Sequence, residues 1–464
     1  MNTQSLACFL VLTFATSFSI VVPFNAKHTP PTSDIFKIHH VWRQVQQWGN
    51  KTYEFQTPHD HRSLTSLPNV LAAIFCFIAS SISSACGIGG GALFIPILTI
   101  VAKQDLKTAS SISSFMVTGG SIANVMFNLR RTNSKFEGKS LIDYDIALSL
   151  EPCMLLGVSV GVICNTAFPE WLVTLLLVIL LAWSFRMICK KGLKLWKTES
   201  EEIKRNSGIN EENGNDKVDE SHHLGNNENT RLKLPWLKLG VLLLIWLSFF
   251  AIYFLRGSKN GQSIIHMKPC GVGYWILSSV QIPLALILTA WIVFWERSPQ
   301  HQTQSQQGQD QCRDVTSKKL LLPLMALLAG ILGGVFGIGG GMLISPLLLQ
   351  VGIAPEITAA TSSFMVLFSS TMSTLQYALM GIEDIKKALV LSTISFVASL
   401  VGLLVVQRAV RKYKRASLIV FSLSAAMALS IVLMTSFGVM GIWRDYKSGK
   451  YMGFKPACKK KQPS

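Results

Sequence analysis

The stretch "CGIGGGALFIPILTI" begins at Cys86, and "FGIGGGMLISPLLLQ" begins at Phe336, 250 positions later. Both place a glycine run in apolar sequence, with a proline five residues after the last glycine. Glycine weakens a helix by about 1 kcal/mol per residue relative to alanine, and proline removes a backbone donor. The two stretches therefore predict that an apolar helix is interrupted at two matching places.

The composition around these stretches indicates a membrane protein. Of the 464 residues, 49% are hydrophobic and 15% are charged, whereas a soluble chain carries about 25% charged residues. Long apolar segments recur along nearly the whole chain, separated by short polar loops. This pattern predicts an all-α polytopic membrane protein.

The basic residues are distributed as expected for a chain that crosses a membrane. The net charge is +18, but the Lys and Arg residues flank apolar segments, at 130–139, 190–197, 318–319 and 408–415. Such flanking follows the positive-inside rule and does not predict a nucleic-acid partner. The nine cysteines show no metal-ligand spacing, so we predict neither a metal nor another cofactor.

Copies of one unit make up most of the chain. The glycine runs align, and "SSFMV" occurs at Ser113 and again at Ser362. Each copy has five apolar elements, and two further spans lie between the copies. The predicted elements are 69–86, 90–102, 108–129, 144–168 and 171–189 in the first copy, 236–255 and 271–295 between the copies, and 320–336, 340–352, 357–380, 385–406 and 417–440 in the second copy. If each glycine-containing element crosses the membrane once, seven elements separate the two starts, which predicts inverted repeats. Re-entrant glycine segments would instead make the copies parallel.

The predicted organisation divides the chain into eight parts. The sequon at Asn50 is a glycosylation candidate if its segment lies outside the cytosol. In order, the parts are a signal peptide or first span (1–26), an extracytosolic polar segment (27–68), transmembrane repeat 1 (69–189), a disordered charged linker (190–235), two central spans (236–295), a polar loop (296–319), transmembrane repeat 2 (320–441) and a basic tail (442–464).

The interrupted helices are the candidate binding site. Irregular backbone is tolerated at membrane depth only inside protein or around a wet cavity. Broken helices at matching places in two halves are typical of transporter sites. Unwound backbone and helix N-termini present N–H groups, which suit an anion. The predicted substrate-binding residues are Gly87, Gly89, Gly90, Gly91, Ser113, Ser114, Gly337, Gly339, Gly340, Gly341, Thr361, Ser362 and Ser363, with Pro96 and Pro346 as helix breaks.

Two features have competing interpretations. Glycines also permit close helix packing in membranes, and we favour packing for Gly157 and Gly161 but a binding site for the glycine runs. Glu151, an acid within an apolar segment, is a candidate for proton coupling. The alternative is an acid hydrated at the end of a span.

The motifs resemble the sulfite exporter TauE/SafE family, also called the toluene-sulfonate uptake permeases. The resemblance lies in "GIGGGALFIPIL" with "TASSISSFM" and in "GIGGGMLISPLL" with "TAATSSFM". It covers residues 69–441 and implies proton-coupled movement of sulfite, sulfonates or related anions. The expected protein is a secondary transporter of a small oxyanion and not an enzyme, in the secretory pathway or plasma membrane. A transport-inactive receptor or scaffold is the alternative, and a homodimer is left open.

Overall fold

The computed structural model describes residues 67–84, 87, 90–129, 140–212, 236–256, 272–296, 321–380, 385–413, 417–447 and 453. Within these ranges the chain is helical and contains no strand. The predicted segment 1–26, the Asn50 sequon and most of the loop 296–319 lie outside the described residues.

Twelve helices are described, and their bounds follow the predicted spans closely. They are α4 (Leu67–Ser84), α5 (Gly91–Ile100), α6 (Leu106–Asn128), α7 (Tyr144–Ala167), α8 (Glu170–Glu212), α9 (Trp236–Arg256), α10 (Val272–Glu296), α12 (Leu321–Phe336), α13 (Gly341–Val351), α14 (Pro355–Met380), α15 (Ile385–Tyr413) and α16 (Ser417–Lys447).

Six of these helices are long and apolar enough to cross a membrane: α4, α7, α8, α9, α15 and α16. The prediction of an all-α polytopic membrane protein is confirmed. Helices α6 and α14 are not among the six, although they have 23 and 26 residues. Both are rich in Ser and Thr and are buried along most of their length at the centre of the bundle.

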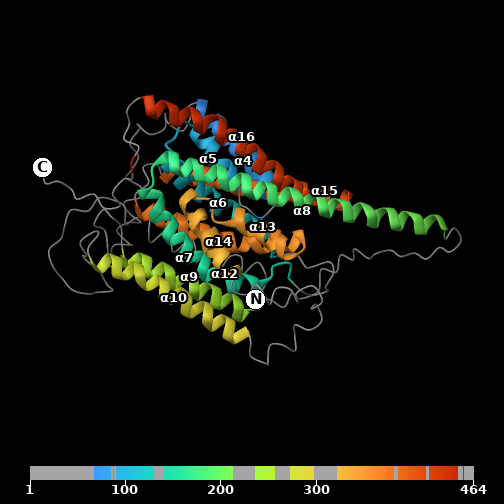
Figure 1. Ribbon diagram of the computed structural model, residues 1–464, viewed down its shortest axis with the longest axis horizontal. Coiled ribbons are helices and arrows are strands. Elements are labelled where there is room, and N and C mark those ends of the chain that lie inside the picture. The colour runs from blue at the N-terminus through green and yellow to red at the C-terminus, as the bar shows by residue number, and fades with distance from the viewer. Residues whose placement is uncertain are drawn as a thin grey trace, which may run out of the picture.

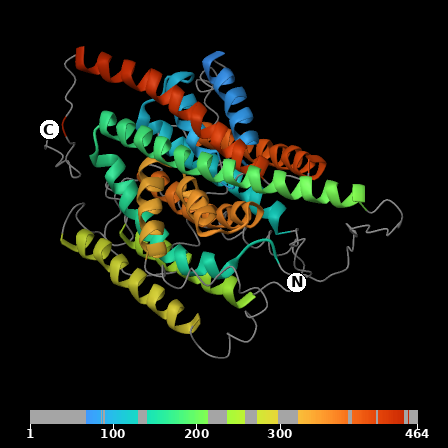
Figure 2. The ribbon, with the colours of Figure 1, turned by 45° about the vertical axis from the view of Figure 1, so that its right-hand side comes forward.

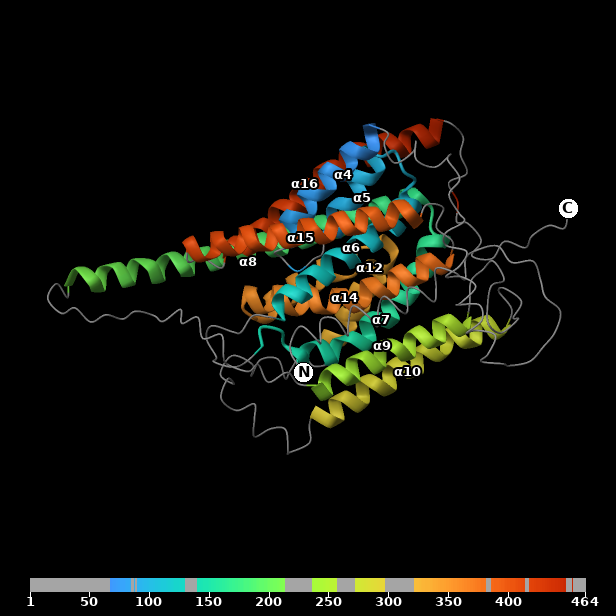
Figure 3. The same cartoon turned by 180° about the vertical axis from the view of Figure 1, so that it is seen from behind.

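The two predicted copies pack crosswise (Figures 1 and 3). Helix α4 packs against α15, and α12 packs against α7. The third helices of the copies, α6 and α14, contact each other, as do the fifth helices, α8 and α16. Each half therefore buries its first helix against the fourth helix of the other half. Whether the copies are inverted or parallel stays a prediction.

Helices α9 and α10 lie side by side at one edge of the bundle, next to α7 (Figures 1 and 2). The indole N–H of Trp246 on α9 donates a hydrogen bond of 3.1 Å to the carbonyl oxygen of Phe368 on α14. The Trp246 ring also stacks on Phe250, at 5.5 Å between centroids. The central insertion is thus packed onto a helix of the second half.

Helix α8 extends into the segment 190–235 that was predicted to be a disordered linker. It continues to Glu212 and projects beyond the bundle (Figure 3), so the prediction of disorder is wrong for residues 190–212. Glu and Lys favour a helix even where there is nothing to bury. The carboxylate of Glu199 also accepts hydrogen bonds from the backbone N–H and the hydroxyl of Ser417, where α16 begins. Residues 213–235 lie outside the described part.

The packing role predicted for Gly157 and Gly161 is confirmed. A Cβ added at Gly157 would lie 2.3 Å from the carbonyl oxygen of Leu327 on α12, and one added at Gly161 would lie 2.1 Å from that of Ile331. Real Cβ atoms do not approach so closely, so α7 and α12 meet at distances that only glycine allows.

Replacing Gly161 with alanine should therefore destabilise the bundle by about 1–3 kcal/mol, the usual cost of overpacking. The measurement is the thermal unfolding midpoint of the purified protein in detergent. Gly240→Ala is the matched control, because nothing lies within 4 Å of a Cβ added there. Equal midpoints for the two variants would contradict the close approach of α7 and α12.

Candidate functional site

Two glycine turns interrupt the apolar helices where the sequence predicts. The first joins α4, which ends at Ser84, to α5, which begins at Gly91; the second joins α12 to α13. Left-handed backbone occurs in both, with φ of +76° at Gly87 and +65° at Gly337. Side chains other than glycine rarely adopt this conformation. Gly89 lies outside the described residues.

Each turn lies against the third helix of the opposite half. A Cβ at Gly87 would lie 2.3 Å from the carbonyl oxygen of Ala359 on α14. A Cβ at Gly337 would lie 1.9 Å from the carbonyl oxygen of Ser110 on α6. Ser110 and Ala359 occupy matching positions in the two copies of the "SSFMV" region. The glycines therefore allow both left-handed backbone and close contact between the halves.

The two turns also meet each other. A Cβ at Gly91 would lie 2.7 Å from the Cβ of Ile338, which belongs to the second turn. Gly339 lies between the two central helices, against Val117 of α6 and Ser370 of α14. The structure thus brings together two glycine runs that the sequence separates by 250 positions.

Both helices that follow the turns begin with an uncapped N-terminus. The N-cap positions of α5 and α13 are Gly90 and Gly340, both with left-handed backbone and without a side-chain cap. The first N–H groups of a helix have no acceptor within the helix itself. The N-terminal ends of α5 and α13 therefore have backbone donor groups and the positive end of the helix dipole.

The carbonyl groups at the ends of α4 and α12 are satisfied by buried side chains. Asn124 on α6 donates through Nδ2 to the Ser84 carbonyl oxygen at 3.1 Å. The hydroxyl of Tyr377 on α14 donates to the Gly334 carbonyl oxygen at 2.7 Å. Asn165 on α7 donates to the carbonyl oxygen of Val335. These three residues were not predicted as site residues, although a polar side chain within an apolar span is a signal for such a role.

The predicted hydroxyl residues are all buried, but most of their protons point at backbone carbonyls. Ser114 and Ser363 donate to Ser111 and Ala359 in their own helices, at 2.7 and 2.6 Å. Ser362 donates to the carbonyl oxygens of Gly87 and Ala359. Among the described residues, the Ser113 hydroxyl has no hydrogen-bond partner. Donors for an anion would come mainly from the backbone N–H groups and from Ser113.

The interpretation of Pro96 and Pro346 as helix breaks is wrong. Helices α5 and α13 continue through these prolines to Ile100 and Val351. Each proline is the sixth residue of its helix, so it removes one backbone hydrogen bond within a short helix packed among others. In membrane proteins neighbouring groups offset such losses. The interruption therefore lies at the glycines alone.

Glu151 is enclosed by protein in the first half of α7. Its exposed fraction is 0%, and neither carboxylate oxygen has a hydrogen-bond partner among the described residues. This burial is incompatible with the alternative of an acid hydrated at the end of a span. An isolated buried carboxylate is costly to ionise, so such groups occur where protonation changes matter.

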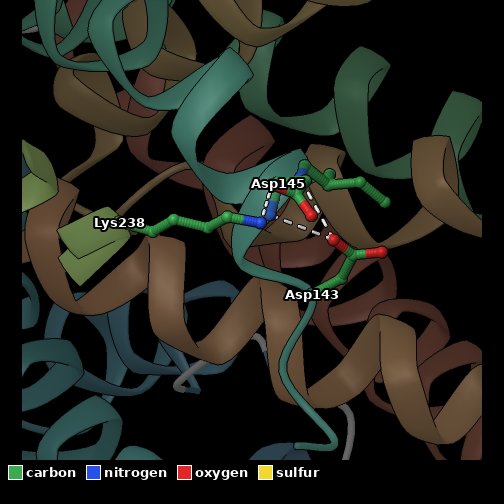
Figure 4. Close-up of polar contacts among 4 residues, drawn as sticks. Asp143, Asp145 and Lys238 are labelled. Atoms are coloured by element: carbon green, nitrogen blue, oxygen red, sulfur yellow. Dashed lines mark hydrogen bonds and ion pairs between the residues drawn. The ribbon is translucent and has the colours of Figure 1, made fainter. Parts of the chain in front are cut away.

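The start of α7 connects the site to the central insertion (Figure 4). The Asp143 carboxylate caps α7 by accepting the backbone N–H groups of Asp145 and Ile146. The pKa of Asp143 is raised, because the effect of burial outweighs these hydrogen bonds. Asp145 forms an ion pair with Lys238 on α9. The Asp143 backbone N–H donates to the hydroxyl of Thr361 at 2.9 Å, so this predicted site residue holds α7 to α14.

A small cavity adjoins the first turn. Its volume is about 80 Å³, and Ser84, Glu356, Ala359, Ser363 and Gln407 are among the residues that line it. A water in the liquid occupies about 30 Å³, so the cavity is on the scale of a few waters or one small ion. Among the described residues, no group of three His, Cys, Asp or Glu side chains is arranged to hold a metal ion.

These features define an integral, multi-pass, helical membrane protein with a broken-helix centre. The model of the family described as Sulfite exporter TauE/SafE matches residues 71–429. The chain therefore belongs to the sulfite exporter TauE/SafE family.

Relatives of similar length occur in Arabidopsis thaliana. Sulfite exporter TauE/SafE family protein 2 is 56% identical over 434 residues, which cover 89% of this chain and 93% of the relative. Family protein 5 is 54% identical over 429 residues, covering 90% and 93%. Family protein 3 is 31% identical over 406 residues, covering 84% and 83%. No solved structure gives a significant match.

Proposed function

We propose that this chain is a secondary transporter of a small oxyanion, sulfite or an organosulfonate, bound between the two glycine turns. The observation that carries the proposal is the meeting of the turns, with Gly91 of the first against Ile338 of the second. Family membership supports the transporter class, and the relatives are named as proteins of the sulfite exporter TauE/SafE family.

The uncapped ends of α5 and α13 would supply the binding energy. A helix N-terminus stabilises an anion by up to about 2 kcal/mol in a partly buried geometry. Two termini and the Ser113 hydroxyl would bind an oxyanion weakly, which permits release. Glu356 in the first turn of α14 lines the adjoining cavity, so the anion would be held at the turns and not in that cavity.

Glu151 is the group we propose for proton coupling. A carboxyl enclosed by protein can hold a proton in one conformation and release it where another conformation admits water. The crosswise packing joins α4 to α15 and α12 to α7, so each pair contains one helix of each half. A movement of one pair against the other is the transport step that we propose.

Uptake into proteoliposomes tests the transporter proposal. Purified protein is reconstituted, and initial rates are measured for labelled sulfite, an aromatic sulfonate, sulfate and phosphate, with protein-free vesicles as the control. We expect saturable uptake of sulfite or the sulfonate, and slower uptake of phosphate. If all four anions enter at the protein-free rate, the transport-inactive receptor or scaffold becomes the better description.

A further inference from the structure

Buried hydroxyl groups differ between the two glycine turns, although the turns have matching sequences. In the described part of the chain, the hydroxyls of Ser113 on α6 and Ser373 on α14 have no hydrogen-bond partner. Both side chains are 0% exposed. An unpaired buried polar group is costly, and in a native structure it is commonly explained by a bound ion or water. The two hydroxyls are therefore candidate donors to a bound group.

Ser373 lies beside the second turn. One helical turn earlier on α14, Ser369 donates to the Gly339 carbonyl oxygen at 2.6 Å. One helical turn later, Tyr377 donates to the Gly334 carbonyl oxygen at 2.7 Å. Residues four apart share a helix face, so Ser373 is placed between these two contacts and alongside the segment that they hold.

Ser113 lies beside the same turn, on the other central helix. A Cβ added at Gly337 would meet the Ser110 carbonyl oxygen, and one added at Gly339 would lie 3.2 Å from Cγ1 of Val117. Ser113 is three residues after Ser110 and four before Val117, on the face of α6 that these contacts define. Hydroxyls from α6 and α14 thus flank the second turn, which leads into the uncapped N-terminus of α13.

The matching side chains at the first turn are already paired. The residue matching Ser113 is Ser362, whose hydroxyl donates to a carbonyl oxygen of that turn at 3.4 Å. The residue matching Ser373 is Asn124, which donates to the Ser84 carbonyl oxygen where α4 ends. The first turn therefore uses both of these side-chain donors to hold its own backbone.

A difference between the copies explains why Ser373 has no partner in the protein. Tyr377 donates to the carbonyl group near the end of α12, the role that Asn124 has at the end of α4. The second copy also has Gly334 where the first has Ser84, so it lacks a hydroxyl at that position. The second turn does not need the Ser373 hydroxyl for its backbone, and this donor is available to a ligand.

We infer that the side-chain donors to the anion are the hydroxyls of Ser113 and Ser373, both at the second glycine turn, and that the first turn contributes backbone groups alone. The inference rests on the proposed function and makes the site asymmetric within a repeated fold. Each hydroxyl donates one hydrogen bond to an oxygen of the anion. Because the two donors belong to α6 and α14, a conformation in which these helices separate would release the anion.

The concentration dependence of uptake tests the inference. Initial rates are measured for labelled sulfite and an aromatic sulfonate in proteoliposomes that contain unsubstituted protein or Ser373→Ala. We expect KM to rise about ten-fold in the variant, as for the loss of one hydrogen bond to a charged group. The maximal rate should stay within about two-fold. Thr371→Val is the control, because the Thr371 hydroxyl donates to carbonyl oxygens of its own helix, and its KM should not change.

The contrary outcomes separate the inference from the proposed function. If Ser373→Ala transports with unchanged KM, the inference is overturned and the transporter stands; a changed unfolding midpoint would then assign the hydroxyl to a buried water. An equal rise of KM in Thr371→Val would also overturn it, because general disturbance of α14 would explain both. If the unsubstituted protein moves neither anion and neither anion shifts its unfolding midpoint, the proposed function fails and the inference with it. If Ser373→Ala does not fold, Ser373→Cys replaces it, since a thiol is a weaker donor and should also raise KM.

Discussion

Replacing Gly337 with alanine is expected to lower the initial rate of sulfite uptake by about ten-fold or more. The loss is expected from the crowding of the added Cβ, because overpacking costs about 1–3 kcal/mol and each 1.4 kcal/mol in a barrier is about ten-fold in rate. The new Cβ would lie 1.9 Å from the Ser110 carbonyl oxygen. The turn must then move away from α6, and the adjacent contact of Ile338 with Gly91 of the first turn changes with it.

Gly352→Ala is the control for this variant. Gly352 also has left-handed backbone, with φ of +103°, but nothing lies within 4 Å of an added Cβ. The variant carries the strain without the contact and should retain transport within a few-fold. Size-exclusion profiles and unfolding midpoints are compared first, so that rates refer to folded protein. Equal losses in the two variants would contradict a special role for the contact between the halves.

The bounds of the helices were predictable because each apolar stretch has a local signal at its ends. Segment 144–168 was expected, and α7 runs from Tyr144 to Ala167, with Asp143 as its cap. The glycine runs likewise predicted the interruptions. The continuation of α8 to Glu212 was not predictable. A charged sequence without an apolar stripe can form either a solvated helix or a disordered linker, and its composition does not distinguish the two.

The contacts within the site could not be predicted from the sequence, for a different reason. Two examples are the hydrogen bond that the Tyr377 hydroxyl donates to the Gly334 carbonyl oxygen and the close approach of Gly337 to Ser110. Both depend on how α12 and α14 pack on α6 and α7. The first contact joins residues 43 positions apart and the second joins residues 227 positions apart, and no local pattern specifies either of them. The prediction that Pro96 and Pro346 break a helix failed for a local reason. The spacing of a motif does not show whether a short helix remains formed after the loss of one hydrogen bond.

Replacing Glu151 with glutamine is expected to abolish uptake driven by a pH gradient, with a loss of about ten-fold or more. Glutamine has the size of glutamate but cannot carry the proton. Exchange of labelled for unlabelled sulfite across the membrane requires no net proton movement, so it should persist. The measurement is gradient-driven uptake and exchange in the same proteoliposomes.

Asp145→Asn is the matched control, an acid-to-amide change on the same helix at a side chain that is 53% exposed. Its ion pair with Lys238 contributes at most about 1 kcal/mol, so both activities should be retained. Glu151 differs in being fully buried. If Glu151→Gln loses exchange and uptake together, Glu151 has a structural role and not a coupling role. If it keeps gradient-driven uptake, the proton is carried elsewhere. Only loss of uptake with retained exchange assigns the proton to this carboxyl.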